Sequence, residues 1–159
     1  MWSTGVNTWQ TPPNPVFKLN FDAVIFSDLN YSGVGAIIRN GKGEVMVAMS
    51  TKGPPVGDNE EAGIWACRRV IEFVIDASFT DLVIEGDNAA VMSSISSPGA
   101  DQSWLGHIIQ DIQWLAQGLR WVCFSHVNQD ANSVAHSLAR YAKNVTKDMV
   151  SLEDTPHQL

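Results

Sequence analysis

Two aspartates and two histidines of this sequence have the side chains that metal binding or proton transfer requires. Asp22 interrupts an alternating apolar segment, and Asp87 follows the apolar run of residues 81–86. His126 ends a second apolar run, and His136 follows in the next segment. Carboxylate oxygens bind hard divalent cations, and imidazole exchanges protons near neutral pH. These four are the candidate catalytic residues, and Asp22 and Asp87 are the candidate metal ligands.

Each candidate also has an ordinary structural explanation, which the residue pattern leaves open. Asp22 is consistent with a solvated carboxylate on a strand, and Asp87 with the N-cap of a following helix. A histidine at a strand end, such as His126, is often a surface residue. His136 lies among apolar residues, which fits a partly buried histidine with a hydrogen-bond partner.

Three strands are predicted near the start of the chain, and the first carries Asp22. Apolar and polar residues alternate over residues 16–26, which predicts a strand with one buried face. Residues 33–39 and 44–49 flank the turn sequence of residues 40–43 and predict a hairpin.

The rest of the chain alternates between helical and strand patterns. The predicted elements are a helix at 62–77, a strand at 81–87, helices at 89–95 and 104–116, a strand at 120–126, and a helix from Asn132 to about Val145. Asn132 is a favourable N-cap residue and is expected to begin the last helix. Ligands in such sheets bind at the carboxyl ends of strands, which is where Asp87 and His126 fall.

This order predicts one α/β domain at residues 16–146. Its sheet is expected to have five strands, three antiparallel and then parallel ones, flanked by helices. The Pro-rich residues 1–15 are expected to form an extended lead-in, because proline removes backbone donors. Residues 147–159 are expected to be a flexible tail.

Composition limits the partners of the chain and the compartment in which it acts. The net charge is −7, and the ten Lys and Arg residues form no basic arm, so a nucleic-acid role must be local or weak. Cys67 and Cys123 lie in apolar runs, which predicts buried thiols in a reducing compartment, with a disulfide as the alternative. No apolar run approaches the length of a membrane helix, and the first residues lack a signal-peptide pattern. The chain is therefore expected inside the cell.

Several common motifs are absent. The sequence contains no P-loop and no paired CxxC for zinc, and the Gly33-Val34-Gly35 segment lies in a predicted hairpin strand rather than before a helix. The tryptophans suit packing positions, although Trp65 or Trp104 would be able to stack on a base if exposed.

Taken together, the motifs resemble the plant ribonuclease H-like domains related to non-LTR retroelement reverse transcriptases. The resemblance extends from Trp9 to about Ala142 and depends on several motifs in the same order. These motifs are Trp9-Gln10-Thr11-Pro12-Pro13, Phe17-Lys18-Leu19-Asn20-Phe21-Asp22, Gly33-Val34-Gly35-Ala36-Ile37-Ile38-Arg39, Ala66-Cys67-Arg68-Arg69, Ile84-Glu85-Gly86-Asp87-Asn88, His126-Val127 and Asn132-Ser133-Val134-Ala135-His136-Ser137-Leu138-Ala139.

The resemblance implies the ribonuclease H fold and cleavage of the RNA strand of RNA–DNA hybrids. In that family four carboxylates, in the order Asp, Glu, Asp, Asp, hold two divalent ions. The first falls on Asp22 and the third on Asp87. His126 corresponds to a loop histidine that assists proton transfer or product release. Asn88 and Asn132, within the matched motifs, are the expected substrate-binding residues.

Two of the four carboxylates are missing from this sequence. Gly63 stands where the family has glutamate, and His136 stands at the fourth position. We expect weaker binding of Mg²⁺, with imidazole favouring Mn²⁺ or Zn²⁺. Glu60 lies one turn before Gly63 but is expected to be about 5 Å out of place, and Glu61 points away.

Two hypotheses for the function follow. The first is a ribonuclease H-type endonuclease dependent on Mg²⁺ or Mn²⁺ and impaired in activity. The second is a pseudoenzyme that uses the fold to bind nucleic acid or a protein partner. Both place the chain in the nucleus or cytoplasm.

Overall fold

A computed structural model describes residues 16–97 and 104–152 of the 159-residue chain. Within these ranges a six-stranded sheet has the order β5-β4-β1-β2-β3-β6. The strands are β1 (Phe17–Phe26), β2 (Tyr31–Arg39), β3 (Val45–Gly53), β4 (Asp81–Gly86), β5 (Trp121–His126) and β6 (Met149–Leu152). The helices are α1 (Asn59–Asp76), α2 (Ala89–Ser96), α3 (Trp104–Ala116), α4 (Ser133–Tyr141) and the short 3₁₀ turns Asp130–Asn132 and Ala142–Asn144.

Strand β1 joins the antiparallel and parallel halves of the sheet. It pairs antiparallel with β2 and parallel with β4, which in turn pairs parallel with β5. The α/β class, the mixed sheet and the antiparallel opening are therefore confirmed. The carboxyl ends of β1, β4 and β5 meet at one edge of the sheet, and this edge carries the candidate site.

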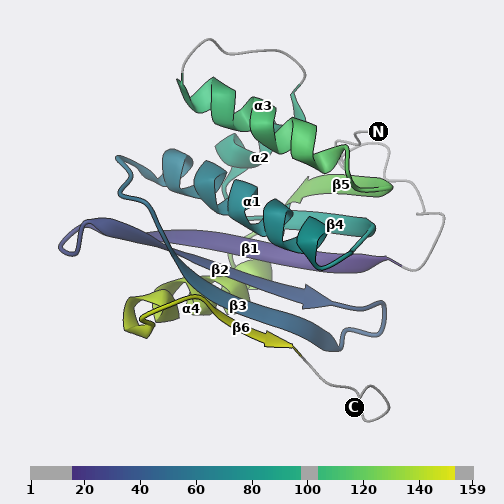
Figure 1. Cartoon of the computed structure of the whole chain (residues 1–159), viewed down its shortest axis with the longest axis horizontal. Coiled ribbons are helices and arrows are strands. Elements are labelled where there is room, and N and C mark those ends of the chain that lie inside the picture. The colour runs from purple at the N-terminus through teal and green to yellow at the C-terminus, as the bar shows by residue number, and fades with distance from the viewer. Residues whose placement is uncertain (1–15, 98–103, 153–159) are drawn as a thin grey trace.

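Helices cover both faces of the sheet (Figure 1). Helices α1, α2 and α3 lie on one side, and α4 lies on the other. The expectation that β1 buries only one face is corrected, because Asn20, on the polar side of the strand, is only 3% exposed. A second helix layer over the strand buries this side chain and therefore requires hydrogen-bond partners for it.

The main core lies between the sheet and helices α1 to α3. Helix α1 begins with Asp58, whose side chain accepts a hydrogen bond from the Glu61 backbone N–H at 2.8 Å. Its apolar face packs against β1, and the largest fully buried side chains of this cluster include Leu19, Ile64, Ile71, Leu82 and Phe124. Apolar burial on this scale provides most of the free energy of folding.

Helix α4 rests directly on the backbone of β2. A Cβ atom added to Gly35 would overlap the backbone of Ala135 and Ala139, and one added to Gly33 would overlap Ala139. Only glycine permits backbone-to-backbone contact this close. The two glycines of the Gly33-Val34-Gly35 segment thus set the height of α4 above the sheet.

The strand count is corrected from five to six. Residues 149–152, which we expected within a flexible tail, form β6 and pair antiparallel with β3. Asp148, just before β6, accepts hydrogen bonds from the Thr51 hydroxyl and from Arg69 Nη2, the latter at 2.8 Å. These contacts hold the segment against β3 and α1. Residues 1–15 and 153–159 lie outside the described residues.

The two cysteines are buried and form no disulfide, as expected. Burial raises the pKa of the Cys67 thiol well above its usual range. Both side chains therefore act as small apolar groups, and the alternative of a disulfide is excluded. In the part of the chain that the structure describes, no helix is both long and apolar enough to cross a membrane.

We predict that Gly35→Ala lowers the free energy of unfolding by about 3 kcal/mol, because its methyl group would displace α4. Gly41→Ala is the matched control, since an added Cβ at Gly41 has nothing within 4 Å. Urea unfolding of both variants measures the difference. Equal stabilities for the two variants would contradict the close contact of α4 with β2.

We predict that Asp148→Asn destabilises the fold by about 0.5 kcal/mol at neutral pH, a small effect because the ion pair is about half exposed. Hydrogen bonds from Thr51 and Arg69 lower the pKa of Asp148. A carboxylate whose pKa is lowered on folding stabilises the folded state at pH values above its pKa in the unfolded chain. This stabilisation is lost as the pH falls through its pKa in the folded state. The difference between wild type and variant, measured by urea unfolding, should therefore shrink in acid.

Candidate functional site

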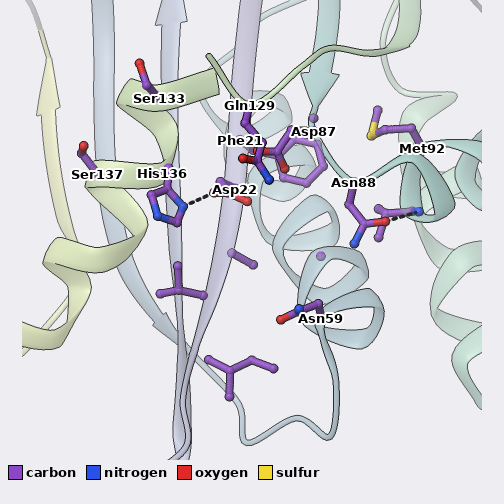
Figure 2. Close-up of a pocket in the computed structure, with 16 residues that line it drawn as sticks. Phe21, Asp22, Asn59, Asp87, Asn88, Met92, Gln129, Ser133, His136 and Ser137 are labelled. Carbon is purple, nitrogen blue, oxygen red and sulfur yellow. Dashed lines mark hydrogen bonds and ion pairs between the residues drawn. The ribbon is translucent and has the colours of Figure 1, made fainter. Parts of the chain in front are cut away.

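A pocket of about 640 Å³ lies at the carboxyl ends of β1 and β4. It is bounded by the start of α1, the start of α2 and the first turns of α4 (Figure 2). Three of the four carboxylate positions implied by the resemblance, and the histidine at the fourth, therefore meet here. The lining residues include Asp22, Asn59, Gly63, Asp87, Asn88, Gln129, Ser133, His136 and Ser137.

Asp22 and His136 are in direct contact. His136 Nδ1 lies 2.7 Å from Asp22 Oδ2, and Figure 2 shows this bond across the pocket between β1 and α4. The contact follows from the close packing of α4 on Gly35. Asp22 is directly paired with Gly35 in the β1–β2 register, so it lies beside the same helix. The structural expectation for His136, a partly buried histidine with a hydrogen-bond partner, is met, and the partner is the first candidate carboxylate.

The pKa of Asp22 is raised above its usual value. Burial is the main cause, and the neighbouring charge of Asp87 adds to it. The hydrogen bond with His136 acts in the opposite direction and only partly offsets the burial. A desolvated carboxylate with a second carboxylate nearby is a common feature of functional sites, and it disfavours the alternative of a freely solvated strand residue.

Asn88 caps helix α2, while the neighbouring Asp87 lines the pocket. Asn88 is the N-cap of α2, and its Oδ1 accepts a hydrogen bond from the Val91 N–H at 3.1 Å. The alternative in which Asp87 caps this helix is therefore wrong. The side chain of Asp87 therefore does not cap α2, and Asp87 lines the pocket.

His126 lies outside the pocket lining. Its ring Nε2 is 3.2 Å from the backbone oxygen of Asp87, and the side chain is exposed. This contact places His126 next to Asp87, which does line the pocket. A role in proton transfer there remains a prediction.

Gly63 is buried against α2. A Cβ atom added to Gly63 would lie 2.8 Å from Val91 Cγ2, closer than real Cβ contacts allow. Helix α2 therefore occupies the space that a longer side chain at position 63 would need. The pocket residue one turn before Gly63 is Asn59, and Glu60 is not among the lining residues. Glu60 therefore lies outside the pocket, and that it does not replace a glutamate at position 63 stays a prediction.

Asn132 is buried in a network of amides rather than exposed to the pocket. It is 1% exposed, its Nδ2 donates to the Phe21 backbone oxygen at 2.8 Å, and its Oδ1 accepts from Asn20 Nδ2 at 3.2 Å. Asn20 Nδ2 also donates to Glu85 Oε1 at 3.0 Å, and Glu85 is 3.8 Å from Lys18 Nζ. Asn132 stands at the N-cap position as expected, but its side chain makes no capping bond to α4.

This network positions the start of α4. It joins β1, β4 and the turn before α4 through the buried amides of Asn20 and Asn132 and the partly buried carboxylate of Glu85. We therefore propose a positioning role for Asn132 in place of the expected substrate contact. The sequence signal for it was the polar side of β1, where Asn20 and Asp22 alternate with apolar residues.

The donor set does not fit the two-ion site of the resemblance. Among the described residues that line the pocket, Asp22 and Asp87 are the only carboxylates, and one oxygen of Asp22 is already bonded to His136. Among the described residues, no group of three or more His, Cys, Asp or Glu side chains is close enough to hold a metal ion. Asn59 was missed from the sequence; its only signal was its position one turn before Gly63.

We predict that Asn132→Ala lowers the free energy of unfolding by about 2 kcal/mol, because it removes two buried hydrogen bonds, one from Asn20 Nδ2 and one to the Phe21 carbonyl. Asn144→Ala is the control, since Asn144 is exposed at the end of the same segment. Urea unfolding compares the two. A loss of hybrid affinity without a loss of stability in Asn132→Ala would instead favour substrate contact.

Comparison with solved structures places the fold. RNase H1 of the archaeon Halobacterium salinarum superposes with a TM-score of 0.72 at 21% identity, covering 81% of this chain and 98% of that chain. The N-terminal RNase H domain of a Mycobacterium tuberculosis protein gives 0.69 at 17% identity, covering 82% and 95%. At such identities the likeness concerns the fold.

Two further similar structures contain nucleic acid. An RNase H1 isolated from compost, solved in complex with an RNA/DNA hybrid, gives a TM-score of 0.68 at 15% identity, covering 80% of this chain and 96% of that chain. The foamy viral protease-reverse transcriptase with an RNA/DNA hybrid gives 0.65 at 14% identity, covering 86% of this chain and 21% of that chain. Among curated proteins, none matches this sequence.

The family is shown by the sequence itself. Residues 20–142 match the protein family described as reverse transcriptase-like, a range that runs from the buried Asn20 to the residue after α4. The matched range includes every residue that lines the candidate site. The chain therefore belongs to the reverse transcriptase-like family and has the RNase H-like fold.

Proposed function

We propose that this RNase H-like domain binds nucleic acid at the pocket between β1, β4 and α4, and that its metal-dependent cleavage of RNA in RNA–DNA hybrids is impaired. The observation that carries the proposal is the pairing of Asp22 with His136 beside a buried Gly63. Asp22 and Asp87 supply two of the four expected carboxylates, and the other two positions in the pocket hold Gly63 and His136.

The loss of two carboxylates weakens the site in charge and in ligand number. Mg²⁺ dehydrates reluctantly and is held by several oxygen ligands, so fewer carboxylates lower its affinity. An imidazole ligand suits Mn²⁺ better than Mg²⁺, so Mn²⁺ is the ion expected to support any residual cleavage. The hydrogen bond from His136 competes for the same Asp22 oxygen that such an ion would use.

Nucleic acid is the partner that the comparisons favour. Two structures of similar fold were solved with an RNA/DNA hybrid bound. The pocket lining contains no Lys or Arg from residues 16–97 or 104–152, and the net charge is −7, so affinity for a polyanion depends on cations outside the pocket. The same absence supports the second candidate, a protein-binding module without nuclease activity.

We also propose a plant, retroelement-related origin, because the ordered motifs from Trp9 to Ala142 resemble that group. The location that we propose is the nucleus or cytoplasm, because two buried cysteines without a disulfide fit a reducing compartment. The functional domain that we propose covers residues 16–146.

The test is cleavage of a labelled RNA–DNA hybrid in Mg²⁺ and, separately, in Mn²⁺. We expect weak cleavage by the wild type, greater in Mn²⁺, and none by Asp22→Asn. Restoring the carboxylates with Gly63→Glu, Val91→Ala and His136→Asp together should raise cleavage in Mg²⁺ by about 100-fold, the scale on which a misplaced group slows an enzyme. Val91→Ala is included because its side chain blocks position 63.

The variant with Val91→Ala alone is the control for a change in packing without a new ligand. Gly63→Glu alone should gain less than the combination, because the glutamate meets Val91. Efficient wild-type cleavage in Mg²⁺ that Asp22→Asn abolishes would overturn the impaired-enzyme proposal. Absence of hybrid binding by the wild type at low salt would instead favour the protein-binding module.

A further inference from the structure

The end of α4 carries a cluster of positive charge in an otherwise acidic chain. Between residues 131 and 147 the sequence has no Asp or Glu, but it has Arg140, Lys143 and Lys147. All three side chains are exposed. In a protein of net charge −7, this segment is therefore distinct in charge from the rest of the molecule.

Helix α4 connects this segment to the pocket. Ser133, His136 and Ser137 line the pocket from the first turns of α4. Arg140 follows His136 by four residues and Ser137 by three, so it continues the same helix face. The positive charge thus begins one turn beyond the pocket and extends away from it.

A cation from β3 lies beside the same end of α4. Lys52 is directly paired with Gly33, and residues paired across antiparallel strands point to the same side of the sheet. An added Cβ at Gly33 would meet Ala139 and Ala142, so this side is the one covered by the end of α4. Lys52 Nζ also lies 4.7 Å from the centroid of the Tyr31 ring.

The cluster is not neutralised within the described structure. None of the ion pairs found in residues 16–97 and 104–152 involves Lys52, Arg140 or Lys143. Tyr141, adjacent to Arg140, is 46% exposed. Exposed aromatic rings beside cations are typical of surfaces that follow a nucleic-acid strand, because phosphates contact the cations and bases or sugars contact the rings.

We propose that Lys52, Arg140 and Lys143, with Tyr141, form a phosphate-backbone binding surface that guides one nucleic-acid strand along α4 into the pocket. We name this the α4 basic surface. The inference rests on the proposed function, since it supplies the cations that the pocket itself lacks. It identifies the partner as a polyanionic strand rather than an acidic protein, because the surface continues directly from the pocket.

The dimensions agree with this assignment. From His136 to Lys143 a helix rises about 10 Å, at 1.5 Å per residue. One strand of a duplex carries a phosphate about every 3.4 Å along its axis, so the surface spans about three phosphates. Two or three of these contacts would dominate the salt dependence of binding.

The test is the affinity of a fluorescently labelled RNA–DNA hybrid, measured by anisotropy between about 50 and 200 mM salt. The test variant is Arg140→Gln with Lys143→Gln. The matched control is Arg39→Gln with Lys42→Gln, which removes one Arg and one Lys from the hairpin at the opposite end of β2. Thermal unfolding and circular dichroism verify that both variants fold.

We expect the test variant to bind more weakly, with a salt slope shallower by about two, and the control to keep the wild-type slope. Wild-type binding with equal effects of both variants would overturn the α4 basic surface and leave the proposed function standing. No hybrid binding by the wild type at the lowest salt would overturn both. A variant with Tyr141→Ala distinguishes the aromatic contact, since it should weaken binding without changing the slope.

Discussion

The site depends on the contact between the backbone of α4 and the two glycines of β2. Because Gly33 and Gly35 have no side chains, α4 lies close enough for His136 to bond to Asp22 on the neighbouring strand. The buried Asn20 and Asn132 amides fix the start of the same helix. Steric fit thus sets the height of α4, and hydrogen bonds set where it begins. The pocket and the α4 basic surface both follow from this placement.

The strand ends could be predicted from the sequence, and with them most of the candidate site. The apolar run of β4 predicted Asp87 at the end of a strand, and the alternation in β1 predicted Asp22 on the polar side of its strand. The pocket brings both together with His136. Periodicity gives the position of a residue along an element, and strand order then gives the edge at which it lies. These are local signals, so a single sequence contains them.

Features that depend on contacts between distant segments could not be predicted. Strand β6 is four residues long and pairs with β3 about a hundred positions earlier, so its pattern alone resembled a tail. Asn132 is a residue type typical of N-caps, but its side chain forms hydrogen bonds with β1 instead. Val91 contacts Gly63 because α1 and α2 pack together, and this packing cannot be predicted from the residue types at the two positions.

The contact between Gly63 and Val91 also has an evolutionary consequence. Because α2 packs against a glycine, a glutamate at position 63 of α1 would destabilise the fold unless Val91 also became smaller. The two positions are therefore energetically coupled, and the effect of a change at one depends on the residue at the other. A lineage that acquired a carboxylate at position 63 in one step would pass through a less stable protein. A carboxylate on this turn of α1 therefore requires two coordinated substitutions rather than one.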